Sequence, residues 1–215
     1  MSAGTHDLEV GGWAGRVMVF LRVGTQIVAV NVLVLLGTLA GAVVLGAYPA
    51  LAAGGSLLAR LAAGAPSEHL WREFWSAYRT GFRRLNVLGA PLTVGIVLLA
   101  LDASVLAAAS PGPTKAALTV GVVALTVYLV LALAILVPVA RRYDDVSAAR
   151  TWRFVAVSPL LSPVTSLAVL VVLVVLAVTF SYVPVLIPLV GLSLPLLASG
   201  WLVDQRLTTL DARTA

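Results

Sequence analysis

The chain contains fifty consecutive residues without a charge, from Phe154 to Val203. A single helix of that length would be about 75 Å long, and the hydrocarbon core of a bilayer is about 30 Å thick. The run therefore predicts two membrane spans joined by a turn, which we place at residues 181–184. Two further uncharged runs, Val23–Pro49 and Ala116–Ala140, also exceed the roughly 18 apolar residues that indicate a transmembrane helix.

The composition supports the same class of protein. Hydrophobic residues make up 60% of the 215 positions, charged residues only 11%, and the mean hydropathy is +1.05. A soluble domain carries about a quarter charged residues, so this chain has too few to cover a water-exposed globule. We predict an all-α, polytopic transmembrane bundle that forms a single domain over residues 1–215. The absence of cysteine excludes a disulfide framework and a thiolate metal site.

Six membrane elements are expected from the uncharged runs and the turn signals between them. A Ser-Pro-Gly-Pro sequence at residues 110–113 separates two of them, and a tight hairpin is placed at Tyr48-Pro49. The short segment 49–64 carries Arg60, so an alternative with five spans leaves it re-entrant or interfacial. The expected spans are about 23–47, 49–64, 87–109, 116–140, 154–180 and 185–203.

The distribution of basic residues predicts the orientation. Cytoplasmic loops of membrane proteins carry the excess of Lys and Arg. With six elements both termini lie on one side, together with thirteen of the fourteen basic residues, and only Lys115 lies on the other. We therefore expect a multi-pass protein of the bacterial cytoplasmic membrane with both termini in the cytoplasm, and the lipid bilayer as its main partner.

One short stretch, residues 67–85, combines aromatic and basic side chains. At about 100° per residue its aromatics fall on one apolar stripe and its arginines lie beside that stripe, which predicts an amphipathic helix in the membrane interface. Two interpretations remain open: a lipid anchor, or a docking helix for another subunit, because Trp, Tyr and Arg dominate interface hot spots. The residues concerned are Trp71, Phe74, Trp75, Tyr78 and Phe82, with Arg72, Arg79 and Arg83.

This order of elements resembles that of the YesL-like bacterial membrane proteins, a family of unknown biochemical function. The matching features are Asn31 in the first span, Pro49-Ala50, the sequence Phe-Trp-Ser-Ala-Tyr-Arg at 74–79, and Phe82. The chain departs from the family pattern at Gly46-Ala47-Tyr48 and at Thr80-Gly81. The resemblance implies an accessory role near an ABC-type sugar importer, with permease subunits or a second copy of the chain as partners.

The sequence offers little reactive chemistry. His6 and His69 are the only histidines, and we expect His69 to pair with Glu73 four residues later rather than to bind metal. Gly37 and Gly41 form a G-x-x-x-G pattern within an apolar span, which favours close helix packing over a phosphate loop. No nucleotide motif or nucleophile constellation is present. We expect no catalytic residue, cofactor, metal or nucleic-acid partner.

Polar residues inside predicted spans are candidates for function because they are costly in lipid. Asp102 is expected near the outer interface, in contact with water or with Lys115; the alternative is a proton or cation site. Asn31 and Gln26 are expected to form hydrogen bonds between helices. We accordingly predict a non-enzymatic accessory component of carbohydrate uptake that acts through intramembrane contacts. The alternative is a small transporter or channel, with Asp102 and Asn31 lining its path.

Overall fold

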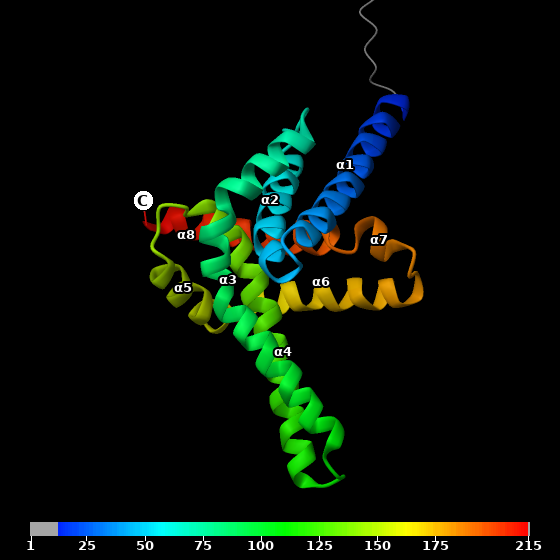
Figure 1. Cartoon of the computed structure of the whole chain (residues 1–215). Coiled ribbons are helices and arrows are strands. Elements are labelled where there is room, and N and C mark those ends of the chain that lie inside the picture. The colour runs from blue at the N-terminus through cyan, green and yellow to red at the C-terminus, as the bar shows by residue number, and fades with distance from the viewer. Residues whose placement is uncertain (1–12, 215) are drawn as a thin grey trace, which may run out of the picture.

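The computed structural model describes residues 13–214, and these form a bundle of α-helices (Figure 1). The helices are α1 (Trp13–Ala40), α2 (Val44–Ala62), α3 (Leu70–Ala108), α4 (Pro113–Arg142), α5 (Ala148–Leu161), α6 (Pro163–Tyr182), α7 (Leu186–Val190) and α8 (Ser193–Thr214). The all-α class predicted from the sequence is confirmed.

Five helical segments in this part of the chain are long and apolar enough to cross a membrane. They are Gly15–Ala40, Val44–Ala62, Leu70–Ala108, Pro113–Arg142 and Pro163–Tyr182. This set includes the short second element, which the five-span alternative had left out. It does not include residues 185–203, which were predicted to be a span.

The C-terminal segment is divided because its helix breaks. Residues 185–203 contribute the short α7 and the first half of α8, separated at Gly191-Leu192. Prolines at 184, 188 and 195 remove backbone N–H groups and disfavour a continuous helix. The predicted turn at residues 181–184 is present, since α6 ends at Tyr182 and α7 begins at Leu186.

The predicted span 154–180 is also wrong in its bounds. Ser162 separates α5 from α6, and Pro163 occupies the first position of α6. The residue before a proline is pushed out of the helical region, so a helix ends more readily there. An uncharged run shows that a segment avoids water, but it does not show where the helix axis changes direction.

The turn between α1 and α2 lies earlier than predicted. It occupies Gly41, Ala42 and Val43, whereas Pro49 lies inside α2. Ala42 and Val43 have positive φ angles of 52° and 66°, a conformation that is strained for residues with a Cβ. This strain accompanies a very close approach of the two helices, described below.

Helix α2 lies between two clusters of buried side chains. One cluster joins Ala50, Ala53, Leu57 and Leu58 of α2 to residues of α1 and α3, and the other joins Tyr48 and Ala52 to α3, α4, α5, α6 and α8. Two adjacent glycines of α2 allow close contact with the helices on either side. A Cβ on Gly54 would meet Val34 of α1, and a Cβ on Gly55 would lie 3.0 Å from Val137 of α4. The short second element is therefore the centre of the bundle.

Helices α3 and α4 form a hairpin whose far end extends away from the other helices (Figure 1). It closes at residues 109–112, where the Ser-Pro-Gly-Pro turn was predicted. Large apolar side chains on its far half, including Val97, Leu101 and Val120, are exposed on the surface of the chain. Such a surface is suited to lipid or to another membrane protein.

Candidate functional site

The aromatic stripe predicted for residues 67–85 is part of the first half of α3, but it does not form an exposed surface. Phe74 is completely buried and Tyr78 nearly so, at 6% exposure, in the cluster shared with α1 and α2. Trp75 and Phe82 are partly buried, and Trp71 alone is exposed, at 61%. A stripe packed inside the protein fits neither a lipid anchor nor a docking face, so both interpretations require correction.

The arginines beside this stripe remain on the surface. Arg72, Arg79 and Arg83 are exposed on α3. Glu73 forms an ion pair with Arg60 of α2 at 2.5 Å, and His69 adds a weaker electrostatic attraction. His6 lies outside the described residues.

Gly37 and Gly41 lie where the backbones of α1 and α2 come closest. A Cβ on Gly37 would lie 3.0 Å from the Phe74 ring and 3.1 Å from the Ala50 Cβ. A Cβ on Gly41 would overlap the backbone of Gly46 and lie 2.8 Å from the Tyr78 hydroxyl. Small residues therefore let the buried aromatics of α3 reach both helices.

Asn31 connects α1 to the break between α7 and α8. Its Nδ2 donates to the Pro188 carbonyl at 2.7 Å, and its Oδ1 accepts the N–H groups of Leu192 at 2.8 Å and Ser193 at 3.1 Å. The side chain is fully buried. It satisfies backbone groups that the broken helix leaves without intrahelical partners. Gln26 has a similar role, donating to the Ser67 carbonyl at 3.1 Å.

Asp102 is exposed on the extended part of α3. Among the described residues it forms no ion pair, and Lys115 instead donates to the Ala109 carbonyl at 3.0 Å. The expected contact between Asp102 and Lys115 is thus not formed. Asp102 is exposed whereas Asn31 is buried, and neither lines any of the three pockets described in the bundle.

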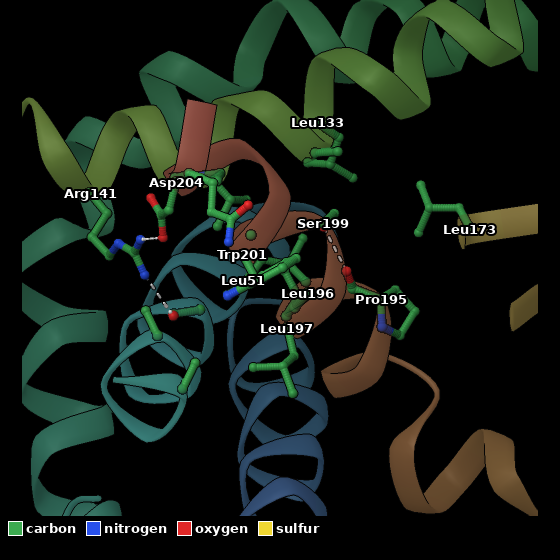
Figure 2. Close-up of a pocket in the computed structure, with 18 of the residues that line it drawn as sticks. Leu51, Leu133, Arg141, Leu173, Pro195, Leu196, Leu197, Ser199, Trp201 and Asp204 are labelled. Atoms are coloured by element: carbon green, nitrogen blue, oxygen red, sulfur yellow. Dashed lines mark hydrogen bonds and ion pairs between the residues drawn. The ribbon is translucent and has the colours of Figure 1, made fainter. Parts of the chain in front are cut away.

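A cavity of about 740 Å³ lies where α2, α4 and α8 meet, with Leu173 of α6 at its edge. Figure 2 shows its leucine side chains, among them Leu51, Leu133, Leu196 and Leu197, together with Trp201. Leu173 and Pro195 lie at one end of the view, and Arg141 and Asp204 lie at the other. The volume is typical of small-molecule sites, which are mostly apolar with a few polar groups.

The polar end of the cavity is an ion pair between two helices. Arg141, near the end of α4, donates through Nη2 to Oδ2 of Asp204 on α8 and through Nη1 to the Gly55 carbonyl of α2 at 3.0 Å (Figure 2). The side chains are 24% and 25% exposed. One guanidinium group thus joins the three helices that form most of the cavity.

Asp204 retains an unused hydrogen-bonding atom. Its Oδ1 is buried and has no hydrogen-bond partner among the described residues. In that part of the chain, Trp75 Nε1 and Tyr78 Oη are also buried without a partner. Of these three residues, Asp204 alone lines the cavity. A buried acceptor without a partner costs about 1–3 kcal/mol, so this atom marks a place where a hydrogen-bond donor would be favourable.

A second polar cluster holds the end of α4 outside the cavity. Arg84 of α3 donates to the carbonyls of Ala140 at 2.9 Å and Tyr143 at 2.8 Å, which satisfies carbonyls that a helix end leaves free. Asp211 of α8 accepts from Arg142 at 2.6 Å and from the Tyr143 hydroxyl at 2.8 Å.

These contacts affect the proton equilibria of the cluster. The Tyr143 hydrogen bond, followed by the Arg142 guanidinium, holds the pKa of Asp211 below its ordinary value. Burial, followed by the hydrogen bond to Asp211, raises the pKa of Tyr143. Both shifts favour the charge states in which the hydrogen bond between the two residues forms.

Sequence reasoning missed the Arg141–Asp204 pair. The only signal for it is positional: Arg141 directly follows the uncharged run 116–140, and Asp204 directly follows the run 154–203. Charges at the ends of two apolar runs meet when the runs end at the same level of a bundle. Nothing in the sequence indicates that the cavity lies beside them.

The described residues contain no group of three or more His, Cys, Asp or Glu side chains placed to hold a metal ion. The site offers hydrogen bonding at one end and an apolar volume at the other.

Comparison with known proteins finds a similarity to one family over part of the chain. Residues 27–103 match the family described as Protein of unknown function, DUF624. The matched region runs from within α1 to the far part of α3, so it contains Asn31, the close-packed glycines and the buried aromatic stripe. No curated protein and no solved structure matches the chain.

Proposed function

We propose that this membrane protein is a non-enzymatic accessory component that acts through contacts with other proteins inside the bilayer. The observation that supports the proposal is the extended hairpin of α3 and α4. Its far half exposes Val94, Val97, Leu98, Leu101 and Val105 on α3, and Val120 and Val123 on α4. On α3 these side chains have the spacing of a single helical face, and they are exposed, so a neighbouring membrane helix can pack on this face without displacing any part of the chain.

The carbohydrate part of the proposal rests on the resemblance to the YesL-like proteins. We propose permease subunits of an ABC-type sugar importer, or a second copy of this chain, as the partners. The match of residues 27–103 to a family of unknown function is compatible with that resemblance and assigns no substrate.

For the orientation, we propose that both termini lie in the cytoplasm. The Arg142–Asp211 contact places the end of α8 beside the end of α4. Arg84 binds the same end of α4, so arginines from two regions of the sequence gather there. The positive-inside rule makes this the cytoplasmic end of a bacterial inner-membrane protein.

Site-specific photocrosslinking in native membranes tests the accessory role. A photoreactive phenylalanine analogue placed at Val97 or Val120 should yield crosslinks to one defined multi-span protein, or to a differently tagged copy of this chain. The matched control is Val174, an equally apolar and exposed position on α6. Crosslinks to lipid alone at Val97 and Val120, as well as at Val174, would contradict the proposal.

The transporter alternative requires Asp102 and Asn31 to share a path. Asn31 uses both ends of its amide on the α7–α8 break, and Asp102 lies on the exposed surface of α3. A transport path through these two residues therefore has no structural support, and the accessory role is the better proposal.

A further inference from the structure

We propose that the cavity between α2, α4 and α8 binds an amphiphile that has a single apolar chain and an uncharged, hydroxyl-bearing head. The head would lie against Arg141 and Asp204, and the chain would occupy the leucine-lined part of the cavity. This inference concerns a ligand, and it does not depend on the accessory role proposed above.

The shape and lining of the cavity indicate the apolar chain. Leucine, alanine and valine side chains line the part of the cavity away from Arg141 and Asp204, which lie at one end (Figure 2). The further polar lining residues Gln205, Thr208 and Thr209 follow Asp204 on α8. Ser199 does not add polarity along the wall, because its hydroxyl donates to the Pro195 carbonyl at 2.6 Å. A molecule with polar groups along its whole length would leave most of them without partners.

The ion pair indicates the chemistry of the head. Arg141 uses two of its five N–H donors on Gly55 and Asp204, which leaves donors for a ligand oxygen. Asp204 has an unpaired acceptor, and the last torsion of a carboxylate side chain is soft enough to turn that oxygen toward the cavity. A hydroxyl group both accepts and donates, so neighbouring hydroxyls can bind Arg141 and Asp204 together.

The charge balance argues for an uncharged head. Arg141 and Asp204 neutralise one another, and both are about three-quarters buried. Adding an anion or a cation there would leave one uncompensated charge in a region of low dielectric constant, which is costly. A diol head avoids that cost and still uses both residues.

Binding of three probes to the full-length protein would test the inference. The protein is purified in a detergent without hydroxyl groups, and bound molecules are counted by native mass spectrometry. The probes share a twelve-carbon chain: monododecanoylglycerol has a diol head, methyl dodecanoate has no donor, and dodecyltrimethylammonium is charged. We expect the diol probe to bind about tenfold more tightly than the other two, which corresponds to about 1.4 kcal/mol.

Two variants and one control locate the binding. Asp204→Asn should remove the preference for the diol probe, and Leu196→Trp should block all three probes by filling the cavity while leaving the ion pair in place. Asp211→Asn is the matched control, because Asp211 forms an arginine ion pair on the same helix but does not line the cavity. It should bind the diol probe as the wild type does.

Several results would overturn the inference. Equal binding of the three probes to the wild type would show that the cavity takes any apolar chain. Diol binding that persists in Leu196→Trp would place the ligand elsewhere, and this result remains decisive if Asp204→Asn does not fold. A loss of binding in Asp211→Asn equal to that in Asp204→Asn would assign the effect to the stability of α8.

Discussion

Gly41 and Gly46 face each other across the turn between α1 and α2 so closely that a Cβ on either glycine would overlap backbone atoms of the opposite helix. The strained φ angles of Ala42 and Val43 accompany this contact. Because the approach leaves no room for a side chain, the composition of the turn is set by packing rather than by helix propensity.

Substitution of these glycines should separate close packing from helix propensity. Gly41→Ala should destabilise the protein by about 1–3 kcal/mol, the usual cost of overpacking. Gly24→Ala, within α1, is the control, since nothing lies within 4 Å of its Cβ position. The control should be neutral, or stabilising by up to about 1 kcal/mol. Denaturant titration in detergent micelles, followed by circular dichroism, measures the free energy of unfolding of each variant. An equal change in Gly41→Ala and Gly24→Ala would contradict the close packing at Gly41.

The aromatic residues of α3 should differ in their contribution to stability according to burial. Phe74→Ala should cost about 3–5 kcal/mol, because the ring is fully buried between α1 and α2. Trp71→Ala, three residues earlier on the same helix, should have a much smaller effect because its ring is largely exposed. The same unfolding measurement applies. A larger loss of stability for Trp71→Ala than for Phe74→Ala would contradict the burial of the stripe against α1 and α2.

The contact between Asp211 and Tyr143 should make stability depend on pH. Because the folded-state pKa of Asp211 is lowered, its contribution is complete above the ordinary value of about 4 and is lost as the pH falls through the lowered value. The unfolding midpoint of the wild type should therefore exceed that of Asp211→Asn near neutral pH, and the difference should shrink below about pH 4. A difference that stays constant with pH would exclude this role for Asp211.

Reporter fusions should establish the sidedness of the membrane elements. Fusions after Ala65, after Asp145 and at the C-terminus should all report the cytoplasm, and a fusion after Gly112 should report the outside. The physical reason is the contact of α8 with the end of α4, which requires the chain to return to that side. A C-terminal reporter on the outside would mean that the Arg141–Asp204 pair does not form in the membrane.

The class of fold was predictable from the sequence because it depends on summed hydrophobicity, which the uncharged runs display directly. The turn at residues 110–113 was predictable for a local reason, the two prolines and the glycine. The direction of the aromatic stripe was not, because periodicity shows that Phe74 and Tyr78 share a face but not what covers it. Gly37 and Gly41, which make room for this face, lie 37 residues before Phe74 and Tyr78 respectively, so no local pattern reveals the contact.

The cavity and its polar end could not be predicted from the sequence for a related reason. Arg141 and Asp204 are 63 residues apart, and their contact depends on where three helices end. Helix ends are also the least predictable part of this chain, as the breaks at Ser162 and Gly191 show.

The bond between Asn31 and Pro188 has a consequence for the order of assembly. The two residues are 157 positions apart, and ribosomes add about 5–20 residues per second, so the Asn31 amide is synthesised roughly 8–30 s before its acceptor. During that interval α1 carries a polar side chain whose final partners do not yet exist. Hairpin α3–α4, whose contacts are close in sequence, can form while α1 waits. The hydrogen bonds of Asn31 on α1 can therefore form only after the α7–α8 break has been synthesised. The N-terminal half reaches its final packing only when translation has nearly ended.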